Sequence, residues 1–156
     1  MRKIFAVCAL IFAYCGKVFA VGLPDEIGEW HKVSENVTPL ITEYNGESHG
    51  RITYRTYKRE SPSAFLEVIL TEGKGTGSLY VPESVNTSKG MMPSDSGFEV
   101  VKVSGHDAII ESQSYMPLVL AATLSRDIIL TVETFALDEK GIIDFTENMI
   151  KYLSIQ

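Results

Sequence analysis

The 156-residue sequence contains only two cysteines, Cys8 and Cys15, and both lie within its first twenty residues. If that segment is removed, the mature chain has no thiol. Disulfide scaffolds, cysteine-ligated zinc, iron–sulfur clusters and cysteine nucleophiles are then excluded. A disulfide-free domain of this size must be stabilised by its apolar core.

Basic residues are also scarce, with 14 Lys and Arg against 20 Asp and Glu. Three of the fourteen, Arg2, Lys3 and Lys17, lie in the first twenty residues, so the mature chain is more acidic still. Such an acidic chain is not expected to bind nucleic acid or an anionic membrane surface.

Spaced pairs of metal ligands are missing as well. The three histidines, His31, His49 and His106, show neither the i, i+4 nor the i, i+2 spacing of paired metal ligands. We therefore expect no metal, no cofactor and no catalytic residue. The alternative is a periplasmic hydrolase or metal-dependent enzyme that uses His106 with nearby carboxylates.

Ser104, His106 and Asp107 have the residue types of a hydrolase triad. A nucleophile, a base and an orienting acid must converge within hydrogen-bond reach. Three residues of one four-residue turn do not converge easily in that geometry, and the glycines of a nucleophile elbow do not flank Ser104. The segment is interpreted as a hairpin turn.

What is present at the N-terminus is a secretory pattern. Arg2 and Lys3 precede an apolar run, Ile4–Tyr14, and Val18–Ala20 suits a signal peptidase. We expect a cleaved signal over residues 1–20 and a periplasmic or secreted protein. The apolar run is shorter than the roughly 20 residues of a membrane span. Tyr14 before Cys15 argues against a lipid anchor.

The mature chain is expected to form one domain over residues 51–156, preceded by an extended lead-in over residues 21–50. Residues 33–42 of the lead-in fit a short helix or a strand. Alternating or apolar runs bounded by turn residues predict antiparallel strands. These runs cover residues 51–59, 64–71, 98–103, 108–115, 118–124 and 128–135.

Residues 138–153 predict one amphipathic helix, because Ile142, Phe145 and Met149 recur at helical spacing. Asp138 is placed to cap its start. A broad apolar stripe must be buried against the sheet. The fold class is therefore α+β, an antiparallel sheet of about six strands with a C-terminal helix packed on one face.

The strand at residues 51–59 carries the most suggestive side chains. Arg51, Arg55, Tyr57 and Arg59 share one face, which we predict to be the outer face. Arginine and tyrosine grip carboxylates or stack on rings, so these four residues, with His106, are the candidate site for a small anionic ligand. In the alternative, the arginines pair with Glu67 or Glu72 on the next strand.

Residues 82–97 are dominated by Pro, Ser, Asn, Gly, Asp and Lys. This connection is much longer than the usual 4–6 residues or so. Met91 and Met92 give it an apolar tip, and they are the candidate contact with a partner protein.

The run Val101–Ala108 follows the pattern V-x-V-x-G-x-x-A and precedes two more strands and a terminal helix. This order of elements, over residues 51–153, resembles the small exported α/β/α sandwich proteins that include the extrinsic photosystem protein PsbP. The resemblance implies a non-catalytic binding or assembly module. We expect such a module of the bacterial envelope, with a protein or a small anionic ligand as its partner.

Overall fold

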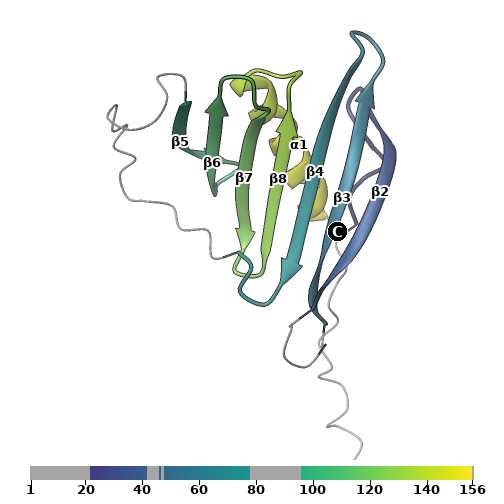
Figure 1. Cartoon of the computed structure of the whole chain (residues 1–156), viewed down its shortest axis with the longest axis vertical. Coiled ribbons are helices and arrows are strands. Elements are labelled where there is room, and N and C mark those ends of the chain that lie inside the picture. The colour runs from purple at the N-terminus through teal and green to yellow at the C-terminus, as the bar shows by residue number, and fades with distance from the viewer. Residues whose placement is uncertain (1–21, 42–45, 47, 78–95, 156) are drawn as a thin grey trace, which may run out of the picture.

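The computed structural model describes residues 22–41, 46, 48–77 and 96–155. Eight strands form a single sheet, and one helix follows them (Figure 1). The elements are β1 (Glu26–Ile27), β2 (Trp30–Ile41), β3 (Ser48–Arg59), β4 (Ala64–Gly73), β5 (Ser96–Val103), β6 (His106–Gln113), β7 (Leu118–Ser125), β8 (Ile128–Thr134) and α1 (Glu139–Ile155).

All neighbouring strands run antiparallel, in the order β1-β2-β3-β4-β8-β7-β6-β5. Two meanders, β1–β4 and β5–β8, therefore meet where β4 pairs with β8. The helix lies against one face of the sheet (Figure 1). The α+β class with a C-terminal helix on one face is confirmed.

The predicted number of about six strands is wrong, because the described residues form eight. The two additional strands come from the segment expected to be a lead-in. Trp30–Ile41 pairs with β3 along almost its whole length, and Glu26–Ile27 pairs with the start of β2. Pro39 lies within β2, and nearly all side chains of this strand are exposed, so no alternation in the sequence decided between helix and strand.

The turns between the later strands follow their residue types. Ser104 and Gly105 have φ values of 49° and 84°, and they join β5 to β6 as a two-residue hairpin turn. Glycine reaches this left-handed region without strain. The expected turn between β7 and β8 lies at Arg126 and Asp127.

The core forms between the helix and the sheet. The predicted stripe of Ile142, Phe145 and Met149 is buried against the sheet. Its partners are mostly aliphatic: Leu66, Val68, Leu70, Leu120, Leu130 and Val132. At the start of the helix, the Gly141 amide donates to Asp138 Oδ1 at 2.8 Å, so the expected cap is present.

Several predictions fall outside the described residues. These are the signal over residues 1–20 with Cys8 and Cys15, and the Met91–Met92 tip. Within the part of the chain that is described, no helix has the length and apolar character needed to cross a membrane.

Candidate functional site

The four candidate residues of β3 share one face, as their alternation predicts, but that face is turned inward. Arg55 is 6% exposed and Tyr57 is completely buried. The prediction that this is the outer face is therefore wrong. The face lies on the side of α1, where the N-terminal residues and Phe145 cover it.

Arg55 joins the N-terminal residues to the sheet. Its Nη1 donates to the carbonyl oxygens of Leu23 at 2.5 Å and Pro24 at 2.8 Å. Its Nε donates to Glu35 Oε2 on β2 at 2.7 Å. One guanidinium thus satisfies two backbone carbonyls and one carboxylate, which uses the fork geometry of arginine.

Tyr57 lies beside Arg55 and completes the same contact. Its hydroxyl donates to the Pro24 carbonyl at 2.6 Å. Burial raises the pKa of Tyr57 above its ordinary value of 10.0, while the neighbouring Arg55 charge lowers it. The folded protein therefore favours the protonated phenol.

This shift predicts a loss of stability in alkaline solution. Above about pH 10, Tyr57 ionises in the unfolded chain but keeps its proton in the folded one, so the free energy of unfolding falls as pH rises. We expect the Tyr57→Phe protein to show a weaker fall, and to be about 1 kcal/mol less stable at neutral pH. Urea unfolding at several pH values measures the free energy of unfolding at neutral pH and its fall with rising pH. Tyr152→Phe, at an exposed position, is the control, and equal slopes in both variants would contradict the prediction.

Arg59 is held at the end of the same face. Its guanidinium lies 4.9 Å from the centre of the Trp30 ring. Nη1 donates to Glu29 Oε1 at 2.8 Å, and Nε donates to the Pro62 carbonyl at 3.2 Å. Arg55, Tyr57 and Arg59 are therefore engaged by their own chain.

Arg51 differs from the other three because it lines the pocket at the end of β2, β3 and β4. Its Nε donates to Glu72 Oε2 on β4 at 2.5 Å. This is the cross-strand ion pair named as the alternative for the arginines. Glu67, the other carboxylate named there, lies on the opposite face of the sheet, since β4 buries Leu66 and Val68 toward α1.

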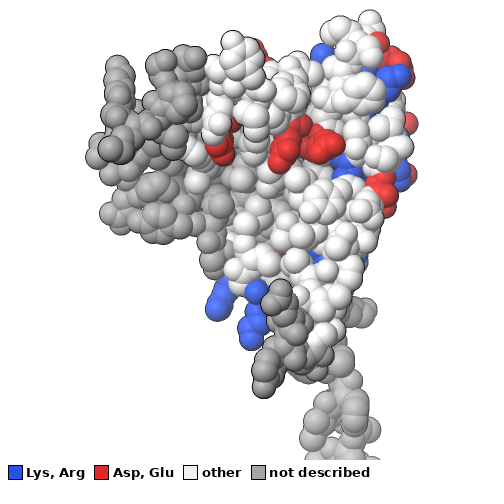
Figure 2. Space-filling view, in the orientation of Figure 1, with Lys and Arg blue, Asp and Glu red and all other residues white. Residues whose placement is uncertain are grey.

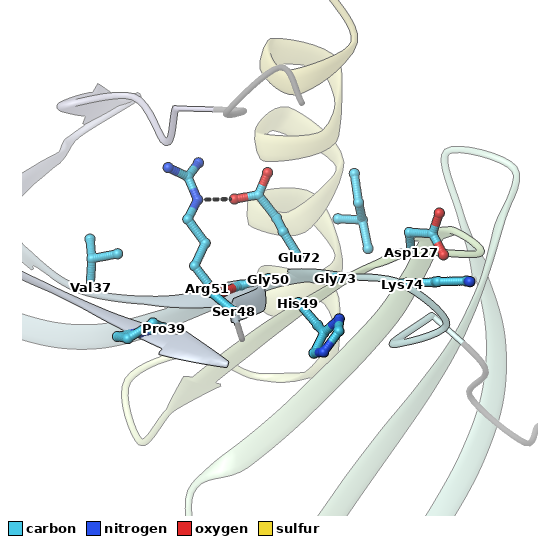
Figure 3. Close-up of a pocket in the computed structure, with 11 residues that line it drawn as sticks. Val37, Pro39, Ser48, His49, Gly50, Arg51, Glu72, Gly73, Lys74 and Asp127 are labelled. Atoms are coloured by element: carbon cyan, nitrogen blue, oxygen red, sulfur yellow. Dashed lines mark hydrogen bonds and ion pairs between the residues drawn. The ribbon is translucent and has the colours of Figure 1, made fainter. Parts of the chain in front are cut away.

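The pocket has a volume of about 720 Å³ and lies at the end of the sheet where β2, β3 and β4 meet the β7–β8 turn. Arg51 and Glu72 extend to one side of the strands and His49 to the other (Figure 3). The lining of the pocket combines apolar and charged residues: Val37, Pro39, Ser48, His49, Gly50, Arg51, Glu72, Gly73, Lys74, Asp127 and Ile128.

Two glycines allow the strands to approach closely beside this pocket. Gly50 on β3 is the register partner of Gly73 on β4. A Cβ on Gly50 would lie 1.9 Å from the Glu72 carbonyl oxygen, so no side chain fits there. The paired glycines are the sequence signal for this site, and sequence reasoning missed it.

Two charged residues from different segments complete the pocket. Asp127 Oδ1 accepts a hydrogen bond from the Gly75 amide at 2.7 Å, which fixes the β7–β8 turn against the end of β4. Within the described residues, Lys74 forms no ion pair. The pocket thus offers one cation that its own carboxylates do not engage.

Residues 46–50 read Gly-Glu-Ser-His-Gly, which matches the G-x-S-x-G spacing of a nucleophile elbow. That motif requires a sharp turn from a strand into a helix. Here Ser48 begins the long strand β3, and its hydroxyl donates to the Gly50 carbonyl at 3.0 Å. The structural context of an elbow is therefore absent at Ser48.

His106 lies apart from the arginines of β3. It lines a small pocket of about 130 Å³ between the sheet and the last turns of α1. The other described residues around it carry no carboxylate: Leu70, Leu124, Ile128, Ile150, Leu153 and Ser154. The adjacent Asp107 forms an ion pair with Lys102 instead. The arrangement gives no support to a hydrolase that uses His106.

No group of three or more His, Cys, Asp or Glu suited to a metal ion occurs among the described residues. Comparison of the chain with models of protein families, with curated proteins and with solved structures found no match.

Proposed function

We propose that this chain is an exported, non-enzymatic binding module of the bacterial envelope, and that its ligand is a small amphipathic anion. The observation that supports this function is the pocket at the end of β2, β3 and β4. Its volume lies within the range of about 300–1,000 Å³ that is typical of small-molecule sites.

The lining of the pocket suits an apolar ligand with one acidic group. Val37, Pro39 and Ile128 supply apolar wall, and Lys74 supplies a cation without an ion pair in the described structure. Glu72 already engages Arg51, and Asp127 already accepts from a backbone amide. Both carboxylates of the pocket are thus already engaged by groups of the same chain. This favours binding of a ligand over catalysis of a reaction of that ligand.

Export is proposed from the sequence of residues 1–20. The basic pair Arg2–Lys3, the short apolar run, and Val18 and Ala20 at the positions that a signal peptidase reads support a cleaved signal. A binding or assembly role is supported by the sequence as well, through the resemblance in element order to PsbP-like exported proteins. Processing of the chain after Ala20, detected by N-terminal sequencing of the exported protein, is the direct measurement.

Calorimetric titration with dodecanoate, an aliphatic carboxylate, tests the ligand class. We expect saturable binding that Lys74→Gln weakens about fivefold, the size of one exposed charge contact. Val37→Asp is expected to weaken it further, because it places a negative charge on the apolar wall. Lys140→Gln, on the exposed surface of α1, is the matched control. Absence of saturable binding, or equal affinity of the Lys74→Gln and parent proteins, would overturn the proposal.

A further inference from the structure

The face of the sheet opposite α1 is open. Within the described residues, no helix or strand covers it (Figure 1). One row of side chains across seven strands of this face is entirely uncharged: Asn36, Tyr54, Ile69, Thr131, Ala121, Ile109 and Val100. Tyr54 and Val100 of this row are 41% and 39% exposed, and Ile69, Ala121 and Ile109 are half-buried. The row therefore offers partly exposed apolar side chains to a partner.

The next row on the open face contains three glutamates. Glu67 on β4 is the direct register partner of Glu133 on β8. Val119 separates Glu133 from Glu111 on β6. At a strand spacing of about 4.8 Å, the three carboxylates extend over roughly 14 Å. We call Glu67, Glu133 and Glu111 the glutamate row.

The glutamate row has no cationic partner among the described residues. Every described basic side chain that forms an ion pair does so with a carboxylate outside the glutamate row. Figure 2 shows acidic side chains across the middle of this largely uncharged face. Like charges in directly opposite register positions destabilise a sheet. The isolated protein thus tolerates an unfavourable arrangement that a cationic partner would relieve.

Exposed phenylalanines accompany the glutamates. Phe65 and Phe135 lie two residues from Glu67 and Glu133 along the chain, and Phe98 is the register partner of Glu111. These rings are 55%, 77% and 37% exposed, respectively. A carboxylate beside an aromatic ring suits a lysine or arginine side chain, which pairs with the one and packs on the other.

We propose that this open face docks a basic amphipathic segment of another protein, with its lysines or arginines on the glutamate row and its apolar side chains on the neighbouring uncharged row. A second copy of the chain is a poor occupant, because it presents the same acidic face and a formal net charge of −6. Residues 78–95 of the chain itself contain one basic residue, Lys89, against Glu83 and Asp95. Charge complementarity therefore favours a basic partner.

Fluorescence anisotropy with a labelled amphipathic peptide of leucine and lysine tests the proposal. We expect binding that the triple change Glu67→Gln, Glu111→Gln, Glu133→Gln weakens at least about tenfold. The matched control neutralises three acidic residues of α1, which lies on the opposite face: Glu139→Gln, Asp144→Asn and Glu147→Gln. It changes the net charge equally, and we expect it to weaken binding much less.

The triple change in the glutamate row is also expected to raise the stability of the isolated protein by a few tenths of a kcal/mol, since it removes the like-charge pair. Equal weakening by both triple variants would overturn the proposal, because binding would then follow net charge alone. Equal binding of a leucine–glutamate peptide would overturn it as well. Binding of phosphatidylcholine vesicles that Phe65→Ser abolishes, without peptide binding, would assign the face to lipid. A dimer disrupted by Phe65→Ser would assign it to a second copy.

This test is independent of the proposed small ligand. Lys74→Gln is expected to leave peptide binding unchanged, since Lys74 lines the pocket at the end of the sheet. Loss of dodecanoate binding with peptide binding intact would therefore affect only the proposed ligand.

Discussion

Replacement of Phe145 with alanine is expected to lower the free energy of unfolding by about 4 kcal/mol. The ring is buried, and it contacts Trp30 and Tyr57 edge-on at centroid distances of 6.0 and 6.1 Å. It therefore joins the helix to both β2 and β3. Alanine would leave a cavity where these three elements meet, and the neighbouring rings would lose their packing.

Urea unfolding followed by circular dichroism measures this loss as a lower midpoint with an unchanged slope. Tyr152→Ala is the matched control, because it removes an aromatic ring from the same helix at a position that is 40% exposed. Its cost is expected to stay below about 1 kcal/mol. Similar losses in the two variants would show that Phe145 does not join these elements.

Arg55→Met is expected to lower the free energy of unfolding by about 3 kcal/mol. The change leaves the Leu23 carbonyl without its donor, the Pro24 carbonyl with the Tyr57 hydroxyl alone, and Glu35 without its cation. The cost falls short of that for a fully buried pair, because the Glu35 side chain keeps contact with solvent. Thermal unfolding should show a midpoint roughly 10 °C lower for a domain of this size.

Two further variants test the reason for this loss. Arg55→Lys keeps the charge but lacks the forked donors, so it should recover less than half of the lost stability. Arg126→Met makes the same kind of change at an exposed turn residue and should cost no more than about 0.5 kcal/mol. Full recovery by lysine would mean that the charge alone, and not the hydrogen-bond geometry, stabilises the N-terminal residues.

Local patterns predicted most elements of the second meander. The strands β5 to β8 and the helix lie close to the expected ranges, because alternation, turn residues and the helical stripe agree there. The first meander was harder to predict. β2 contains Pro39 and lacks a buried alternate face, and β1 contains only two residues. β2 forms because β3 supplies a long partner for pairing, and β1 in turn pairs with the start of β2.

The candidate site was predicted only in part. Arg51 was recognised as a candidate, and it does line the pocket. Lys74 and Asp127 were not, because they come from a glycine-rich turn and a hairpin turn more than 50 residues apart in the sequence. Local periodicity carries no information about such pairs. Gly50 and Gly73 themselves were visible in the sequence, but their close approach is a property of the tertiary structure.

The sequence by itself determined which residues share a face of each strand, where the helix begins and which of its side chains form the apolar stripe. These properties follow from periods of 2 and 3.6 residues and from local capping. Only the tertiary structure decided which face of β3 is buried. A strand of alternating Arg, Tyr and Thr has two faces of similar polarity, and the choice depends on what covers them. Here Leu23, Pro24 and Phe145, all distant in sequence, cover Arg55 and Tyr57. None of the described elements covers the opposite face with its glutamate row.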